Sequence, residues 1–182
     1  MGILLGLAPF IAFFALMRLV SPLAGLAAGL VASLLLGVRM WWRGETIKIL
    51  EIGSLILFAG LTLYTLVAAP AWSVASVRLV VDAGLLAIVL VSLAIGRPFT
   101  LPYARERVPK EFWAAPRFLH ANRVITSVWA AAFAVLVAAD AAAEYLPAVP
   151  LTVDVVASIL AFAGAVAFTS WYPAKLRRAV GL

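Results

Sequence analysis

The sequence has no cysteine, a single histidine and few charged residues. Without cysteine, the chain forms no disulfide, no thiolate nucleophile and no cysteine-held zinc or iron–sulfur site. One histidine, His120, is too few for a histidine-held metal or haem site. We therefore expect neither a metal nor a cofactor. Charged residues make up only 12% of the chain, whereas disordered chains are polar and highly charged, so a disordered protein is excluded.

Hydrophobic residues make up 66% of the 182 residues, and the mean hydropathy is +1.13. A water-soluble domain of this size has too little interior to bury them. The composition predicts an all-α integral membrane protein with a single polytopic domain over residues 1–182. A crossing needs about 20 apolar residues. Six runs of about this length favour a bundle of six transmembrane helices: residues 3–20, 22–40, 46–69, 72–95, 118–139 and 150–172.

Prolines stand where these helices are expected to begin or end. Ser21-Pro22 and Val149-Pro150 place proline at a helix start, and Pro70 and Pro173 follow the expected ends. The first run is short and contains Pro9. It either crosses fully or forms a re-entrant or interfacial segment, which leaves five spans. No positively charged segment precedes it, so we do not expect a signal peptide.

Basic residues gather on one side of the predicted bundle. With six spans, twelve of the fourteen Lys and Arg residues fall in the connections 41–45 and 96–117, in their flanks and in the C-terminal tail. The exceptions are Arg18 and Arg78. The positive-inside rule places this side and the C-terminus in the cytoplasm. The net charge of +6 therefore points to anionic lipid and not to nucleic acid.

Two opposite charges lie within the predicted fourth span. Arg78 and Asp82 are four residues apart and share one helix face. Asp82 lies about 15 Å below Trp72, near the middle of the bilayer. Charge at this depth is costly and usually has a role. The pair is either a proton or cation site or a neutralised pair that fixes helix packing.

The remaining polar residues carry simpler interpretations. Lys48 and Glu51 are expected to form an interfacial pair, and Asp154 to complement a helix dipole. His120 is expected at headgroup level. No catalytic motif, phosphate-binding glycine loop or close pair of carboxylates is present, so the sequence does not favour an enzyme.

Small residues recur every four positions along the second span. Gly25, Gly29, Ser33 and Gly37 form a stripe that lets another helix approach closely. Such a stripe is typical of packing inside a bundle, or of a homo-oligomer or partner interface. The spacing leaves both interpretations open.

Residues 96–117, here called the connecting segment, are the most unusual part of the chain. The segment joins the fourth and fifth spans and mixes prolines, basic residues and the aromatic residues Phe99, Tyr103, Phe112 and Trp113. This mixture favours a cytoplasmic interfacial loop with rings in the membrane and cations toward anionic lipid. It is either a docking platform for a partner or a linker lying on lipid. Its basic residues are Arg97, Arg105, Arg107, Lys110 and Arg117.

Several short stretches resemble the intracellular septation protein A family of bacterial inner-membrane proteins. They are residues 9–15 (PFIAFFA), 38–43 (VRMWWR) and 60–63 (GLTL), then Arg97-Pro98, Trp129-Ala130 and Phe133. Ala71-Trp72-Ser73 stands where the family is lysine-rich, so the chain resembles a distant relative. The resemblance implies a role in envelope integrity or division through contacts with other membrane proteins. It implies no cofactor and no catalytic residue.

Two hypotheses follow. The first is a non-enzymatic membrane protein that acts through helix and loop contacts with membrane-protein partners. The second is a small transporter or channel that uses Arg78 and Asp82.

Overall fold

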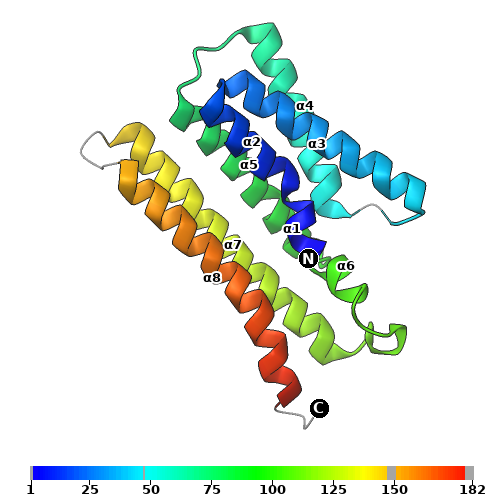
Figure 1. Ribbon diagram of the computed structural model, residues 1–182. Coiled ribbons are helices and arrows are strands. Elements are labelled where there is room, and N and C mark those ends of the chain that lie inside the picture. Colours follow the sequence, from blue (N-terminus) through cyan, green and yellow to red (C-terminus); the bar gives the residue numbers. More distant parts are fainter. Residues whose placement is uncertain (1, 47, 147–150, 179–182) are drawn as a thin grey trace. The chain divides into compact units, whose positions relative to one another are not determined.

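The computed structural model describes residues 2–46, 48–146 and 151–178, and every regular element in these ranges is a helix (Figure 1). Five helices in this part of the chain are long and apolar enough to cross a membrane, and one apolar helix is shorter. The chain is thus a multi-pass helical membrane protein, as its composition predicts. Its contacts divide it into two compact units, Met1–Ile88 and Val89–Leu182. Each unit is described by itself.

The first apolar run is broken into two helices. Helix α1 covers Gly2–Gly6 and α2 covers Ala8–Leu19, where the sequence favours one continuous run. Pro9 lies in the first turn of α2, which tolerates a residue without a backbone N–H. Twelve residues extend about 18 Å, well short of about 30 Å of hydrocarbon. The long helices therefore provide the spans, and α2 alone is too short to cross.

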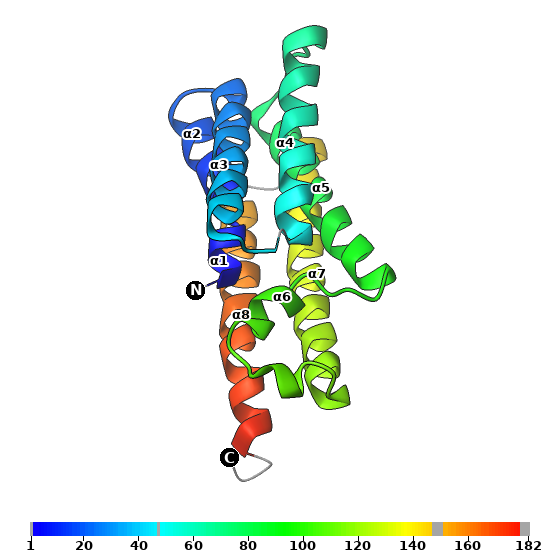
Figure 2. The same ribbon diagram turned by 90° about the vertical axis from the view of Figure 1, so that its right-hand side faces the viewer.

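Helix α3, Pro22–Arg43, begins and ends at residues suited to these positions. The Ser21 Oγ accepts a hydrogen bond from the Ala24 backbone N–H at 3.2 Å, and Pro22 follows directly. The helix ends at Gly44, which has a φ of 62° and so adopts the left-handed conformation that glycine tolerates best. The predicted start at Ser21-Pro22 is confirmed. Figure 2 shows α2 and α3 side by side.

Close packing at glycine joins the helices of the first unit. A Cβ atom at Gly25 would lie 2.7 Å from the Met17 Cβ on α2. One at Gly29 would lie 2.5 Å from the ring of Phe58 on α4, Ile49–Ala68. Two members of the stripe thus lie at contacts inside this unit. Gly37 has no such neighbour within 4 Å among the described residues.

Helix α5, Val74–Ala94, packs against α4 in the same manner. A Cβ at Gly53 would meet the Ile88 side chain at 2.7 Å, and one at Gly84 would meet Leu57 at 2.4 Å. These close approaches place α5 beside α4 around Gly84 and Ile88. The boundary between the two units falls within α5.

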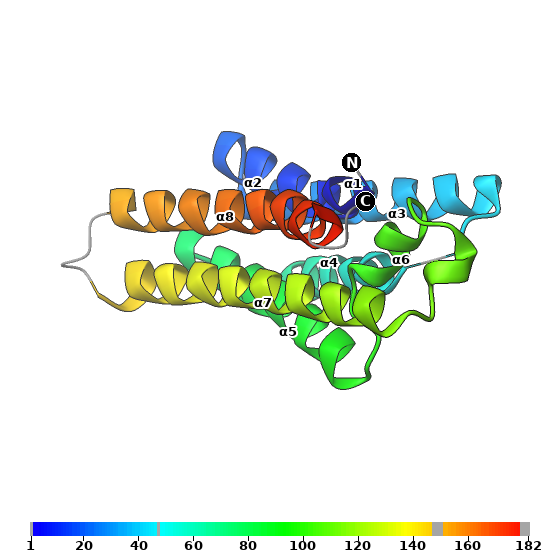
Figure 3. The ribbon, with the colours of Figure 1, turned by 90° about the horizontal axis from the view of Figure 1, so that it is seen from below.

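The second unit is built on a hairpin of α7, Pro116–Tyr145, and α8, Leu151–Arg178. The two helices run side by side (Figures 1 and 3). Trp129 on α7 joins them, since its Nε1 donates to the Thr169 Oγ1 at 2.9 Å. Its ring also meets Phe162 edge-on at 5.3 Å between centroids. Only 11% of the apolar window of α8 is buried in the protein, as expected for a helix whose apolar surface faces lipid.

Both helices are longer than the sequence analysis predicts. The sequence places Asp140 in a connection, but the residue is helical and its side chain is 1% exposed. Pro173 was expected to follow the last helix, but it lies inside α8. A proline costs a helix one backbone hydrogen bond without necessarily ending it, and α8 continues to Arg178. The expected start at Val149-Pro150 lies outside the described residues.

The candidate interaction surface and the buried charges

The connecting segment is a folded structure. It contains the short helix α6, Leu101–Arg105, and a 3-10 turn, η1, at Lys110–Phe112. Gly96 starts it with a φ of 69°. The Gly96 N–H donates to the Leu93 carbonyl, and the Arg97 N–H donates to the Ser92 carbonyl. This pair of bonds is a Schellman motif, which turns the chain sharply out of α5.

The first half of the segment is anchored to α7 by a buried polar network. The Thr100 Oγ1 lies 2.8 Å from the Thr126 Oγ1 and 3.1 Å from the Asn122 carbonyl oxygen. A hydroxyl has one hydrogen, so Thr126 donates to Thr100 while Thr100 donates to Asn122. All three residues are at least 97% buried. A satisfied buried network of this kind fixes one arrangement of the chain.

Aromatic packing strengthens the same anchor. The Phe99 ring is 1% exposed and meets Trp129 edge-on, with centroids 6.3 Å apart. The Phe99 N–H donates to the Ser92 Oγ at 3.2 Å. Tyr103 is buried as well. Both rings were expected in lipid, but they are buried in the protein, and Phe99 packs against α7.

The second half of the segment presents cations around one indole ring. The Arg105 guanidinium carbon lies 5.2 Å from the Trp113 ring centroid, and the Lys110 Nζ lies 6.0 Å from it. The indole is held by its Nε1, which donates to the Val108 carbonyl oxygen at 2.9 Å. We call Arg105, Lys110 and Trp113 the Trp113 cluster. Phe112 beside it is 50% exposed.

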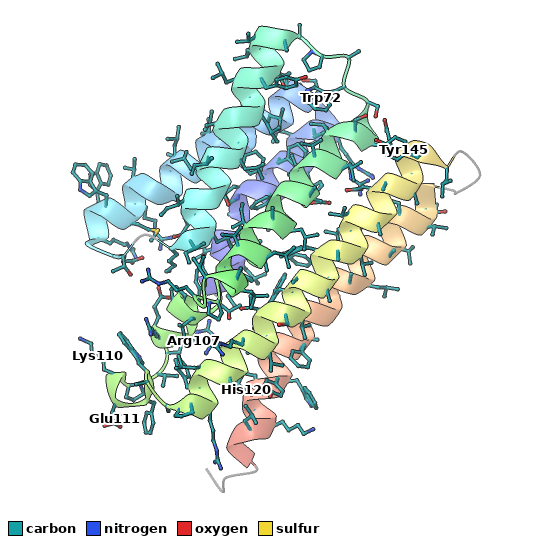
Figure 4. The ribbon with its side chains drawn as sticks, turned by 180° about the vertical axis from the view of Figure 1, so that it is seen from behind. Trp72, Arg107, Lys110, Glu111, His120 and Tyr145 are labelled. Atoms are coloured by element: carbon teal, nitrogen blue, oxygen red, sulfur yellow. The ribbon has the colours of Figure 1, made fainter. Side chains whose placement is uncertain are left out.

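The basic residues of this surface lie outside any salt bridge in the described part of the chain. Arg105 and Lys110 form no salt bridge there, and neither do the exposed residues Arg97, Arg107 and Arg117. Figure 4 shows Arg107, Lys110 and Glu111 near the start of α7, with Tyr145 at its other end. The segment therefore offers a fixed, basic and partly aromatic surface at one end of the second unit.

Arg78 and Asp82 are buried, as a position inside the bundle requires. Their side chains are 6% and 0% exposed. The Arg78 guanidinium carbon lies 5.9 Å from the ring of Phe14 on α2. Both charges thus lie in the protein interior.

The other polar residues singled out from the sequence lie at helix starts or on the surface. The Lys48 N–H donates to the Glu51 Oε2 at 2.8 Å, which caps the start of α4. Asp154 lies in the first turn of α8 and is buried. His120 is exposed on α7 (Figure 4). Across residues 2–46, 48–146 and 151–178, no three His, Asp or Glu side chains come together in a group that could hold a metal.

Two features were missed by the sequence analysis. The first is the network of Thr100, Asn122 and Thr126. Its signal was the pair Asn122 and Thr126, spaced four residues apart in an otherwise apolar helix, which places two polar groups on one face. The second is the buried carboxyl of Asp140. The predicted fifth span ends at residue 139, so Asp140 was placed in a connection and not in a helix.

Comparisons of the chain with protein-family models, with curated proteins and with solved structures find no match.

Proposed function

We propose that the chain is a non-enzymatic protein of the bacterial inner membrane that supports envelope integrity or division by contacting other membrane proteins. The observation that carries this proposal is the connecting segment. Thr100 and Phe99 anchor its first half on α7, and its second half presents the half-exposed Phe112 and cations that form no salt bridge in the described part of the chain. Aromatic and arginine side chains are enriched in protein interfaces. The resemblance to the septation protein A family supports the same role.

The proposal includes an orientation in which the connecting segment and the C-terminus are cytoplasmic. The distribution of twelve of fourteen basic residues supports it. The natural absence of cysteine makes it testable by labelling of single cysteines in intact cells. Arg107→Cys should resist a membrane-impermeant maleimide until the membrane is opened, whereas Ala71→Cys should react at once. The reverse pattern contradicts the orientation.

The functional test neutralises the connecting segment. In a strain that lacks the native chain, the variant Arg105→Gln/Arg107→Gln/Lys110→Gln should insert normally but fail to restore cell length and detergent resistance. A matched control, Arg39→Gln/Arg43→Gln, removes exposed charge on the same predicted side and should restore both. Full restoration by the triple variant would refute the proposal.

A second candidate function is a small transporter or channel, favoured by the burial of Arg78 and Asp82 in a spanning helix. Buried charge in a span usually marks an ion or proton path. In this proposal Asp82 binds the ion or proton and Arg78 keeps it ionised.

Flux across proteoliposomes separates the two functions. A transporter loses ion or proton flux on Asp82→Asn and keeps it on Glu45→Gln, which removes an exposed carboxylate. If Asp82→Asn folds, inserts and behaves like the native chain, the buried pair is structural.

A further inference from the structure

We propose that the Trp113 cluster is a binding site for the phosphate group of an anionic phospholipid. Two cations from different parts of the connecting segment, Arg105 at the end of α6 and Lys110 in η1, converge on one ring. Like charges repel, and both an aromatic face and an anion offset that repulsion. The indole supplies the aromatic face, and in this proposal a lipid phosphate supplies the anion.

The cluster is preorganised, which a specific site requires. Trp113 is fixed by its bond to the Val108 carbonyl oxygen. Arg105 ends α6, whose start follows the buried Thr100. The Arg105 Nε is itself buried without a hydrogen-bond partner among the described residues. The indole and the fold, and not a carboxylate, therefore position this guanidinium and leave its charge available to a ligand.

The chemistry of the cluster selects a phosphate group. A guanidinium binds phosphate oxygens through a planar fork, and a lysine ammonium adds a point charge. The half-exposed Phe112 lies next to Trp113 in the chain and supplies apolar surface for the lipid part of the ligand. Aromatic rings favour the headgroup level of a membrane. A phospholipid provides a phosphate group for the two cations and an apolar part for Phe112, whereas free phosphate contacts only the cations.

This inference rests on the proposed function in one respect, namely that the connecting segment lies at the membrane surface. Its test is nevertheless separate, because it measures lipid binding by purified protein and not cell division. If the native chain binds no phosphatidylglycerol but supports normal cell length, only the site is refuted. Intact lipid binding with no cellular role would refute only the function.

The test titrates the full chain in non-ionic detergent with dioctanoyl phosphatidylglycerol and follows binding by calorimetry. Inorganic phosphate and dioctanoyl phosphatidylcholine are titrated in parallel. Arg105→Gln and Lys110→Gln should each weaken phosphatidylglycerol binding by about tenfold, the loss expected when a charge-assisted contact is removed. Arg123→Gln removes one positive charge from the exposed surface of α7. In the described part of the chain, Arg105 and Lys110 are the cations that contact the Trp113 ring, and Arg123 is not among them. Because Arg123 lies outside the Trp113 cluster, this variant should change the affinity for phosphatidylglycerol by less than about twofold.

Lys110→Gln keeps the test valid if Arg105→Gln fails to fold, since Lys110 is exposed. Saturable binding of phosphatidylglycerol with these selective losses supports the site. If Arg123→Gln and Lys110→Gln lose the same affinity for phosphatidylglycerol, the lipid is attracted by the overall positive charge, and the site is overturned. Equal affinity for inorganic phosphate would overturn the assignment to lipid, and an absence of saturable binding would overturn the site itself.

Discussion

Substitution of Thr100 tests whether the buried network holds the connecting segment in place. Thr100→Val keeps the shape of the side chain but removes its hydroxyl. The Thr126 hydroxyl then loses the oxygen that lies 2.8 Å away, and Asn122 loses a donor 3.1 Å from its carbonyl oxygen. Both remaining groups stay buried, so water cannot replace the lost bonds at no cost.

A buried polar group left without its partner costs about 1–3 kcal/mol. If this cost falls on the attachment of the segment to α7, the population of its open form rises about 5- to 150-fold. Limited trypsin digestion in detergent measures this population, because cleavage follows the open fraction when opening is fast. Cleavage after Arg105, Arg107 and Lys110 should accelerate by the same factor.

Thr62→Val is the matched control. Thr62 is 8% exposed, and its Oγ1 has no hydrogen-bond partner among the described residues. Removal of this hydroxyl should leave stability unchanged or raise it slightly, because a poorly satisfied polar group is lost. Equal trypsin rates for native chain and Thr100→Val would refute the role of the network. So would an equal acceleration in Thr62→Val.

Two further predictions concern stability in detergent. Gly29→Ala places a Cβ against the buried Phe58 ring and should destabilise the chain by about 1–3 kcal/mol. Gly37→Ala meets nothing within 4 Å among the described residues and should leave the Tm unchanged or raise it; equal Tm losses would contradict this packing. Trp129→Phe removes the bond to the Thr169 hydroxyl and part of a buried ring. It should cost about 1–3 kcal/mol, and an unchanged denaturant midpoint would show that this contact does not hold α7 to α8.

The sequence predicted the helical class and the centres of the long helices, because long apolar runs have few other stable forms in a membrane. It also predicted the start of α3, since Ser21 and Pro22 act locally through a cap and a fixed φ. The burial of Arg78 and Asp82 follows from their shared helix face within a span. Features that depend on nearby residues or on span length are readable from sequence.

Features that depend on contacts between distant residues were not predicted. The burial of Phe99 needs Trp129, thirty positions away, so composition alone suggested lipid. Asp140 lies one residue beyond the predicted fifth span and is buried there, because α7 extends past that limit. Pro173 was read as a terminator, but the helix continues through it. At Phe99, tertiary packing outweighs the preference that composition suggests.

The most direct measurement of the central claim is site-specific photocrosslinking in living cells. A photoreactive phenylalanine analogue replaces Phe112, which is 50% exposed on the connecting segment, and, as a control, Leu63, which is 63% exposed on α4. We predict a protein adduct of defined mass at Phe112 that disappears in the triple neutralised variant, and only lipid adducts at Leu63. Lipid adducts alone at both positions would contradict a protein-docking role for the segment.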